Sequence, residues 1–181
     1  LPLRDAVHGI KGLYHINAVD CVTQWQVVAS VQTISEAHLL SVIEQMLAQF
    51  PFEILGFHAD NGSEYVNHKV ARLLDKLRIE FTRSRPRHSN DNGLAETKNG
   101  AVVRKEFGYA HIHRRHAARF NAYCREYLNP FLNFHRPCLF ATELADPKKP
   151  GRIKRVYRPR DAMTPLDKLA SLPGAANILR P

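Results

Sequence analysis

The chain has 181 residues, of which 44% are hydrophobic, which favours one folded domain and excludes a fully disordered chain. No run approaches the roughly 20 apolar residues that a membrane-spanning helix needs, and the three cysteines lack the regular spacing of a disulfide framework. The formal net charge of +9 indicates a polyanionic partner, with nucleic acid favoured over an anionic membrane surface.

The first part of the chain predicts strands. The abrupt start at "LPLRDAV" reads as a piece of a longer protein, and its residues 3–7 predict a short first strand. Residues 13–20 and 25–32 combine alternation with β-branched side chains, which is typical of two further strands. The four residues between these segments suit the connection of an antiparallel hairpin.

Helices and strands alternate after the hairpin. Ser35 is a candidate N-cap for a helix whose apolar residues recur at spacings of three and four, and Pro51 ends it. Residues 53–58 predict the next strand. Apolar residues over 66–77 then mark a second helix, and residues 79–84 predict a short strand.

The second half predicts helices and a basic extension. The polar, basic segment 85–93 predicts a loop, and a third helix begins near Gly93. A fourth helix is expected over 113–133. Its apolar stripe, interpreted as core packing, consists of Phe120, Tyr123, Cys124, Tyr127, Leu128 and Phe131. Residues 146–161 form a Lys- and Arg-rich arm suited to non-specific phosphate binding, and a short helix capped by Thr164 follows.

This order of elements predicts an α/β fold in which a mixed five-stranded sheet carries helices on both faces. Residues 1–140 are expected to form that domain. Residues 141–181 are expected to form a basic C-terminal extension with a short terminal helix.

Three acids lie where such a sheet brings side chains together. Asp60 ends the fourth strand, Glu96 stands in the first turn of the helix after the basic loop, and Asp5 lies on the first strand. Neighbouring carboxylates repel one another, and a divalent cation relieves that repulsion. Oxygen ligands of this kind select Mg²⁺ or Mn²⁺, which suits chemistry on a phosphodiester.

The segments around these acids resemble a known family. They are "HADNGSEY" (58–65), 35 residues between Asp60 and Glu96, "SNDNGLAETKNGAVVRK" (89–105), "LNFHRPC" (132–138) and "MTPLDKL" (163–169). Together they resemble the catalytic core of retroviral integrases and of insertion-sequence transposases with the Asp–Asp–35–Glu signature. The resemblance implies an RNase H-like fold and a metal-dependent polynucleotidyl transferase that cleaves phosphodiesters and transfers DNA strands.

The resemblance also implies roles for the acids. Asp60 matches the second acid and Glu96 the third, and all three acids would bind Mg²⁺ or Mn²⁺. Asp5 in "RDAVH" is the favoured first acid. Asp20 is the alternative first acid, and it lies at the far end of the second strand, where related transposases often carry a non-catalytic aspartate.

Basic and polar residues near these acids are candidates for DNA contact. They are Arg83, Arg85, Arg87, Lys98, Asn99, Arg104 and Lys105. The resemblance implies transposon ends and target DNA as partners, a homo-oligomer of two or more subunits, and a bacterial cytoplasmic, nucleoid-associated location. Two alternatives remain: an RNase H-like nuclease without joining activity, and a non-catalytic DNA-binding relic of a transposase.

Overall fold

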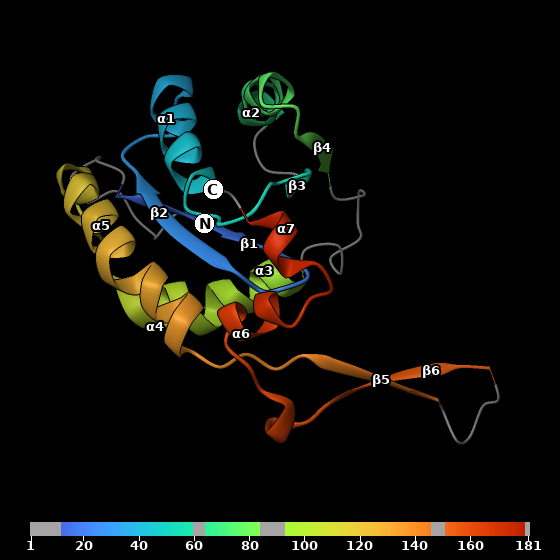
Figure 1. The fold of residues 1–181 in the computed structure, drawn as a ribbon. Coiled ribbons are helices and arrows are strands. Elements are labelled where there is room, and N and C mark those ends of the chain that lie inside the picture. Colours follow the sequence, from blue (N-terminus) through green and yellow to red (C-terminus); the bar gives the residue numbers. More distant parts are fainter. Residues whose placement is uncertain (1–11, 60–63, 84–92, 146–150, 180–181) are drawn as a thin grey trace.

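The computed structural model describes residues 12–59, 64–83, 93–145 and 151–179 (Figure 1). The strands are β1 (Tyr14–Val19), β2 (Gln26–Val31), β3 (Gly56–Ala59), β4 (Glu80–Arg83), β5 (Ala141–Ala145) and β6 (Ile153–Tyr157). The α-helices are α1 (Glu36–Leu47), α2 (Glu64–Lys76), α3 (Gly93–Lys98), α4 (Arg104–Phe107), α5 (Ala117–Tyr123), α6 (Pro165–Ala170) and α7 (Ala175–Ile178). No helix in these ranges is long and apolar enough to cross a membrane.

Further helical turns extend three of these helices. Asn99–Val103 is π-helical and joins α3 to α4, and a 3₁₀ turn at Arg114–His116 leads into α5. Two more π-helical segments, Cys124–Leu128 and Phe131–His135, continue α5. The predicted helix over 113–133 is therefore confirmed as a helical run over 114–135.

The predicted mixed α/β class is confirmed, but a single five-stranded sheet is not observed. Within the described ranges the strands form three two-stranded sheets, of which β1–β2 and β5–β6 are antiparallel and β3–β4 is parallel. The predicted first strand, at 3–7, lies outside the described residues. The observed hairpin β1–β2 confirms the predicted strands at 13–20 and 25–32.

β2 lies between two helical layers (Figure 1). All six of its residues are buried, and they alternate between the layers because successive side chains of a strand point to opposite faces. Val27 packs with Met46 and Phe50, on and just after α1, whereas Val28 packs with Leu128 on the other side. Helices therefore cover both faces of this strand.

The side chains of α1 also pack in clusters with α2 and with α6. Ile43 of α1 packs against Val70 and Leu74 of α2. Leu169 of α6 is buried in the cluster around Trp25, so α6 contributes to the core. A capping box at Thr164 and Asp167 begins α6, which confirms the expected short helix and its cap. The division of the chain at residue 140 stays a prediction.

Three asparagines of the helical run 114–135 cover the outer edge of β2. Asn133 accepts from the Gln26 N–H at 2.8 Å and donates to the Gln26 carbonyl at 2.8 Å. The carboxamide of Asn129 bonds the same two groups of Val28, at 2.9 and 3.2 Å. Asn121 does so with Ser30, at 2.7 and 2.9 Å. Side-chain amides thus replace a neighbouring strand along this edge.

The π-helical segment Cys124–Leu128 explains how these asparagines align. Asn121 and Asn129 are eight residues apart, whereas two α-helical turns take about 7.2 residues, so the two side chains would drift out of line on a regular α-helix. The wider i→i+5 turn advances each residue by a smaller rotation and restores the alignment.

The predicted core stripe of this helical run is wrong for three aromatic residues. Cys124 and Leu128 are buried, but Tyr123, Tyr127 and Phe131 are 39%, 65% and 52% exposed. The aromatic side chains lie on the exposed side because the asparagines, together with Cys124, Leu128 and Leu132, occupy the side that faces β2.

β5 and β6 form a hairpin that extends away from the other elements (Figure 1). Its side chains are mostly exposed, and Arg155 pairs with Glu143 across the two strands at 3.3 Å. The segment expected to be an irregular basic arm is therefore partly a β-hairpin.

His15 is a largely buried histidine, and its protonation is expected to destabilise the fold. Its ring stacks on Phe107 with centroids 4.6 Å apart, its Nδ1 lies 2.7 Å from Ser30 Oγ, and its buried Nε2 has no hydrogen-bond partner among the described residues. Burial lowers the pKa of His15 from 6.5 to about 4.

We expect the free energy of unfolding to fall as the pH drops from about 6.5 to about 4, because the unfolded chain takes up this proton first. The pKa difference corresponds to roughly 3 kcal/mol, or about 2 kcal/mol after allowance for partial exposure. Urea unfolding across this pH range measures the loss. His15→Phe should remove this part of the pH dependence, and an unchanged slope in that variant would assign it to other groups.

Candidate active site

Glu96 is presented at the start of a helix. α3 begins at Gly93, so Glu96 stands in the first turn, where the helix dipole and the unpaired N–H groups stabilise a carboxylate. The side chain is exposed and makes no hydrogen bond or ion pair with another described residue. Its oxygens are thus available for a ligand.

The other two predicted acids, Asp5 and Asp60, lie outside the described residues. β3 ends at Ala59 and α2 begins at Glu64, which confirms the strand and the helix expected on either side of Asp60. No cluster of three or more His, Cys, Asp or Glu able to hold a metal occurs in the ranges that the structure describes. The proposed set of three acids is therefore a prediction from the sequence.

A chain of amide side chains attaches the Glu96 helix to the sheet. Asn17 of β1 donates to Asn99 Oδ1 at 2.9 Å, and Asn17 Oδ1 accepts from Gln26 Nε2 at 2.8 Å. Gln26 is held in turn by Asn133 through its backbone. This network fixes the turn after α3 against β1. It gives Asn99 a structural role beside its predicted contact with DNA.

Lys98 lies in a different place from the one expected for a DNA-contacting residue. Its side chain is 8% exposed rather than on an open helix face, and Nζ donates to Cys138 Sγ at 2.9 Å. A phosphate contact by Lys98 requires the side chain to leave this position.

Of the other residues predicted to contact DNA, two are exposed, and the side chains of the remaining three are not described. Arg104 and Lys105 are exposed on α4, in the helical run that carries Glu96. Arg83 is the last residue of β4, where its backbone alone is described, and Arg85 and Arg87 lie outside the described residues. Contact of these residues with DNA stays a prediction.

Asp20, the alternative first acid, organises the hairpin turn. Its Oδ2 accepts from the Val22 N–H at 3.2 Å, the Thr23 N–H at 2.6 Å and the Thr23 hydroxyl at 2.6 Å. An aspartate bonded to the backbone two and three residues ahead is a common turn-forming arrangement. This local role accounts for Asp20 without a metal, and the choice of Asp5 as the first acid stays a prediction.

We expect Asp20→Ala to lower the free energy of unfolding by about 1–2 kcal/mol, because three hydrogen bonds to a carboxylate are lost at a partly exposed turn. The metal-dependent DNA cleavage that the sequence resemblance predicts should be unaffected in the folded variant. Thermal unfolding and a cleavage assay on the same preparation measure both effects. A large loss of cleavage without a loss of stability would instead assign Asp20 to the metal site.

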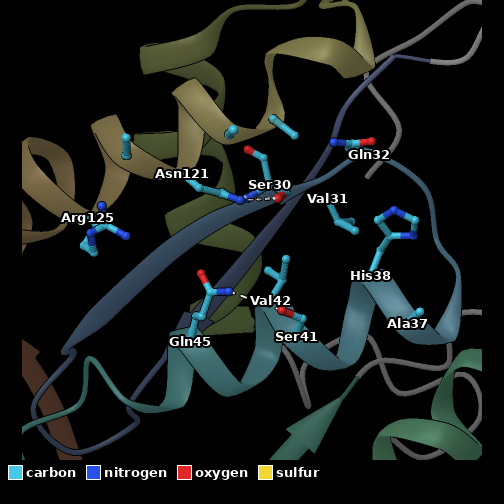
Figure 2. Close-up of a pocket in the computed structure, with 13 residues that line it drawn as sticks. Ser30, Val31, Gln32, Ala37, His38, Ser41, Val42, Gln45, Asn121 and Arg125 are labelled. Carbon is cyan, nitrogen blue, oxygen red and sulfur yellow. Dashed lines mark hydrogen bonds between the residues drawn. The ribbon is translucent and has the colours of Figure 1, made fainter.

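A pocket of about 560 Å³ lies between α1, the end of β2 and α5 (Figure 2). Its lining includes the polar residues His38, Gln45 and Arg125, and Asn121, which also lines it, donates to the Ser30 carbonyl. None of the predicted acids or DNA-contacting residues lines it. The pocket is therefore separate from the candidate active site.

Comparison with known proteins places a family signature over the first half of the chain. Residues 5–89 match the family model described as "Integrase core domain", which confirms the resemblance over these residues. The matched segment contains Asp5 and Asp60, and Glu96 follows it by seven residues.

A curated relative is similar over part of its length. It is the "Uncharacterized protein y4rM" of Sinorhizobium fredii (strain NBRC 101917 / NGR234), 33% identical over 93 residues. The aligned segment covers 51% of this chain and 27% of the relative, so the chain spans about a quarter of that protein.

Proposed function

Because residues 5–89 match the integrase core domain, we propose that this protein is the catalytic core of a DNA transposase or integrase. It cleaves phosphodiesters in a metal-dependent reaction and then transfers the freed 3′-hydroxyl end to target DNA. Asp5, Asp60 and Glu96 are its acids.

The placement of Glu96 is the observation that carries the proposal. A carboxylate 36 positions after Asp60 stands on the first turn of a helix, exposed and without a described partner. The helical run that carries it is bonded to β1 through Asn99 and Asn17. A carboxylate without a described partner, on a helical run bonded to the sheet, suits a ligand that arrives from solvent, since positioning before the reaction lowers its barrier.

The donor chemistry fits a divalent cation. Carboxylate oxygens are hard ligands, and Asp5, Asp60 and Glu96 would hold Mg²⁺ or Mn²⁺ together with phosphate oxygens of the DNA. When bound, such an ion supplies Lewis-acid activation of the phosphodiester and an activated water or hydroxyl. The residues of this chain place the acids and, through Arg104 and Lys105, neutralise the DNA backbone.

DNA is the partner most consistent with the charge of +9, and assembly of two or more subunits on paired DNA ends belongs to the same proposal. The basic hairpin of β5 and β6 adds Lys154 and Arg155, both exposed, as sequence-independent contacts. Arg155 is partly neutralised by Glu143, so Lys154 is the freer charge of the two.

A branched DNA that imitates the joined product tests the proposal. Strand transfer exchanges one phosphodiester for another, so an enzyme that performs it also catalyses the reverse reaction. The complete protein with Mn²⁺ or Mg²⁺ should resolve the branch and rejoin the target strand, and EDTA should stop the reaction.

Other products would support the alternatives. Cleavage without rejoining would identify a nuclease, and retention of the DNA in a gel without either reaction would identify a binding relic. Activity that persists in EDTA would contradict the metal-dependent mechanism.

A further inference from the structure

Lys98 and Cys138 form a buried pair that the proposed function does not use. Nζ lies 2.9 Å from Sγ, and the two residues are 8% and 7% exposed. No carboxylate of a described residue forms an ion pair with this lysine, so the sulfur is its described partner.

The backbone on each side of the pair is fixed. Cys138 exchanges two backbone hydrogen bonds with Met163, at 2.7 and 3.1 Å, which ties it to the segment before α6. Lys98 ends α3, and the next residue, Asn99, is bonded to Asn17 of β1. The nitrogen and the sulfur therefore belong to residues 40 positions apart whose backbones are both anchored.

We propose that Lys98 and Cys138 are an oxidative modification site, at which a peroxide-class oxidant links Nζ covalently to Sγ. Peroxide first transfers oxygen to the thiol, giving a sulfenic acid and water. The Lys98 amine then attacks this sulfur, the S–O bond breaks, and the oxygen leaves as water with a proton from nitrogen. Oxidised cysteines react with nitrogen nucleophiles in this way.

The electrons balance in this sequence. One peroxide is reduced, the sulfur is oxidised by two electrons, and the protein loses two hydrogen atoms as the S–N bond forms. When a second peroxide first oxidises the Lys98 amine to a hydroxylamine and is reduced to water, the hydroxylamine oxygen attacks the sulfenic sulfur, the S–O bond breaks and water leaves. The link is then N–O–S, and the protein gains one oxygen and loses two hydrogen atoms. Both products join the same two residues.

The other two cysteines provide internal comparisons. Cys21 is exposed, and no described lysine contacts it. Cys124 is 1% exposed among Val28 and Leu128, and burial raises the pKa of its thiol to about 12, which suppresses the reactive thiolate. Cys138 differs from both because a nitrogen nucleophile lies against its sulfur.

The link would connect α3, which carries Glu96, to the segment that leads into α6. Formation of the link does not depend on the proposed function. Any effect of the link on DNA cleavage does depend on the proposed function. The covalent link and the enzyme activity therefore need separate measurements.

The test treats the complete protein with hydrogen peroxide and compares intact masses before and after reduction with dithiothreitol. The expected change is the loss of two hydrogen atoms, with or without the gain of one oxygen, and dithiothreitol should reverse it. Tryptic mapping should find one peptide that joins Lys98 to Cys138, with cleavage after Lys98 lost.

Variants separate this link from other oxidation. Cys21→Ser should keep the linked peptide, whereas Cys138→Ser and Lys98→Arg should each lose it. Thermal unfolding checks that these variants fold, and the wild-type peptide map decides the question alone. Oxygen added to Cys138 with normal cleavage after Lys98, or a disulfide between two cysteines, would overturn the proposal.

Discussion

We expect Glu96→Gln to lower the rate of metal-dependent DNA cleavage by about 10³-fold or more. Glutamine keeps the size of the side chain but removes the negative charge that binds the cation. Metal ligation contributes several kcal/mol of transition-state stabilisation, and a loss of about 4 kcal/mol corresponds to roughly 10³ in rate. Single-turnover cleavage of an end-labelled duplex in Mn²⁺ measures the effect.

The stability of this variant should change by at most about 1 kcal/mol, because Glu96 is exposed and interacts mainly with the helix dipole. Glu44→Gln is the matched control, since Glu44 is also an exposed helical glutamate and lies on α1. It should cleave DNA at the wild-type rate. Equal cleavage by the Glu96 variant and by the wild type would remove Glu96 from the active site.

Local patterns predicted most of the elements. The alternation at 13–20 and 25–32, the spacing of three and four after Ser35, and the Thr164 cap each depend on neighbours in the chain, so they can be read without the fold. The assembly of strands into one sheet depends on contacts between distant segments. The described strands form separate pairs, and that part of the prediction is not confirmed.

The side-chain orientations were harder to predict. The aromatic spacing at Tyr123, Tyr127 and Phe131 fits a core stripe on a regular helix, but π-helical turns change the phase and turn these rings outward. The asparagines of this run were a sequence signal for the side that faces the sheet, because Asn is unfavourable inside helices unless its side chain has a partner.

The sequence also held a signal for the burial of Lys98, but the charge of this residue suggested an exposed side chain. Lys98 stands four residues before the buried Val102 in the same helical run. A nearby buried position favours a buried side chain. The spacing of Asp60 and Glu96 identified the candidate acids without any knowledge of the fold, because that spacing is part of the sequence signature that this chain resembles.

The largest effect on stability is expected for Asn129→Ala. The carboxamide of Asn129, 3% exposed, satisfies both the N–H and the carbonyl of Val28 and also donates to Gln49 Oε1 at 2.8 Å. Val28 is fully buried, so water has poor access to these backbone groups after truncation. Each unsatisfied buried group costs about 1–3 kcal/mol.

We expect a loss of about 3 kcal/mol after a small gain in helix propensity, which lowers the unfolding midpoint by about 6–12 °C for a chain of this length. Urea and thermal unfolding measure it. Asn177→Ala is the control, because the same substitution is made at an exposed position on α7 and should change stability by less than about 0.5 kcal/mol.

Asn129→Leu separates hydrogen bonding from volume. Leucine fills the space but bonds neither group of Val28, so it should destabilise about as much as alanine, whereas wild-type stability would show that packing alone matters.

Loss of Asn129 and Asn133 together would leave Val28 and Gln26 unpaired along the same edge. An unpaired strand edge is a template for another chain, so we expect the double variant to associate with rising concentration. Its sedimentation against that of the wild type decides whether these asparagines keep β2 from pairing between molecules.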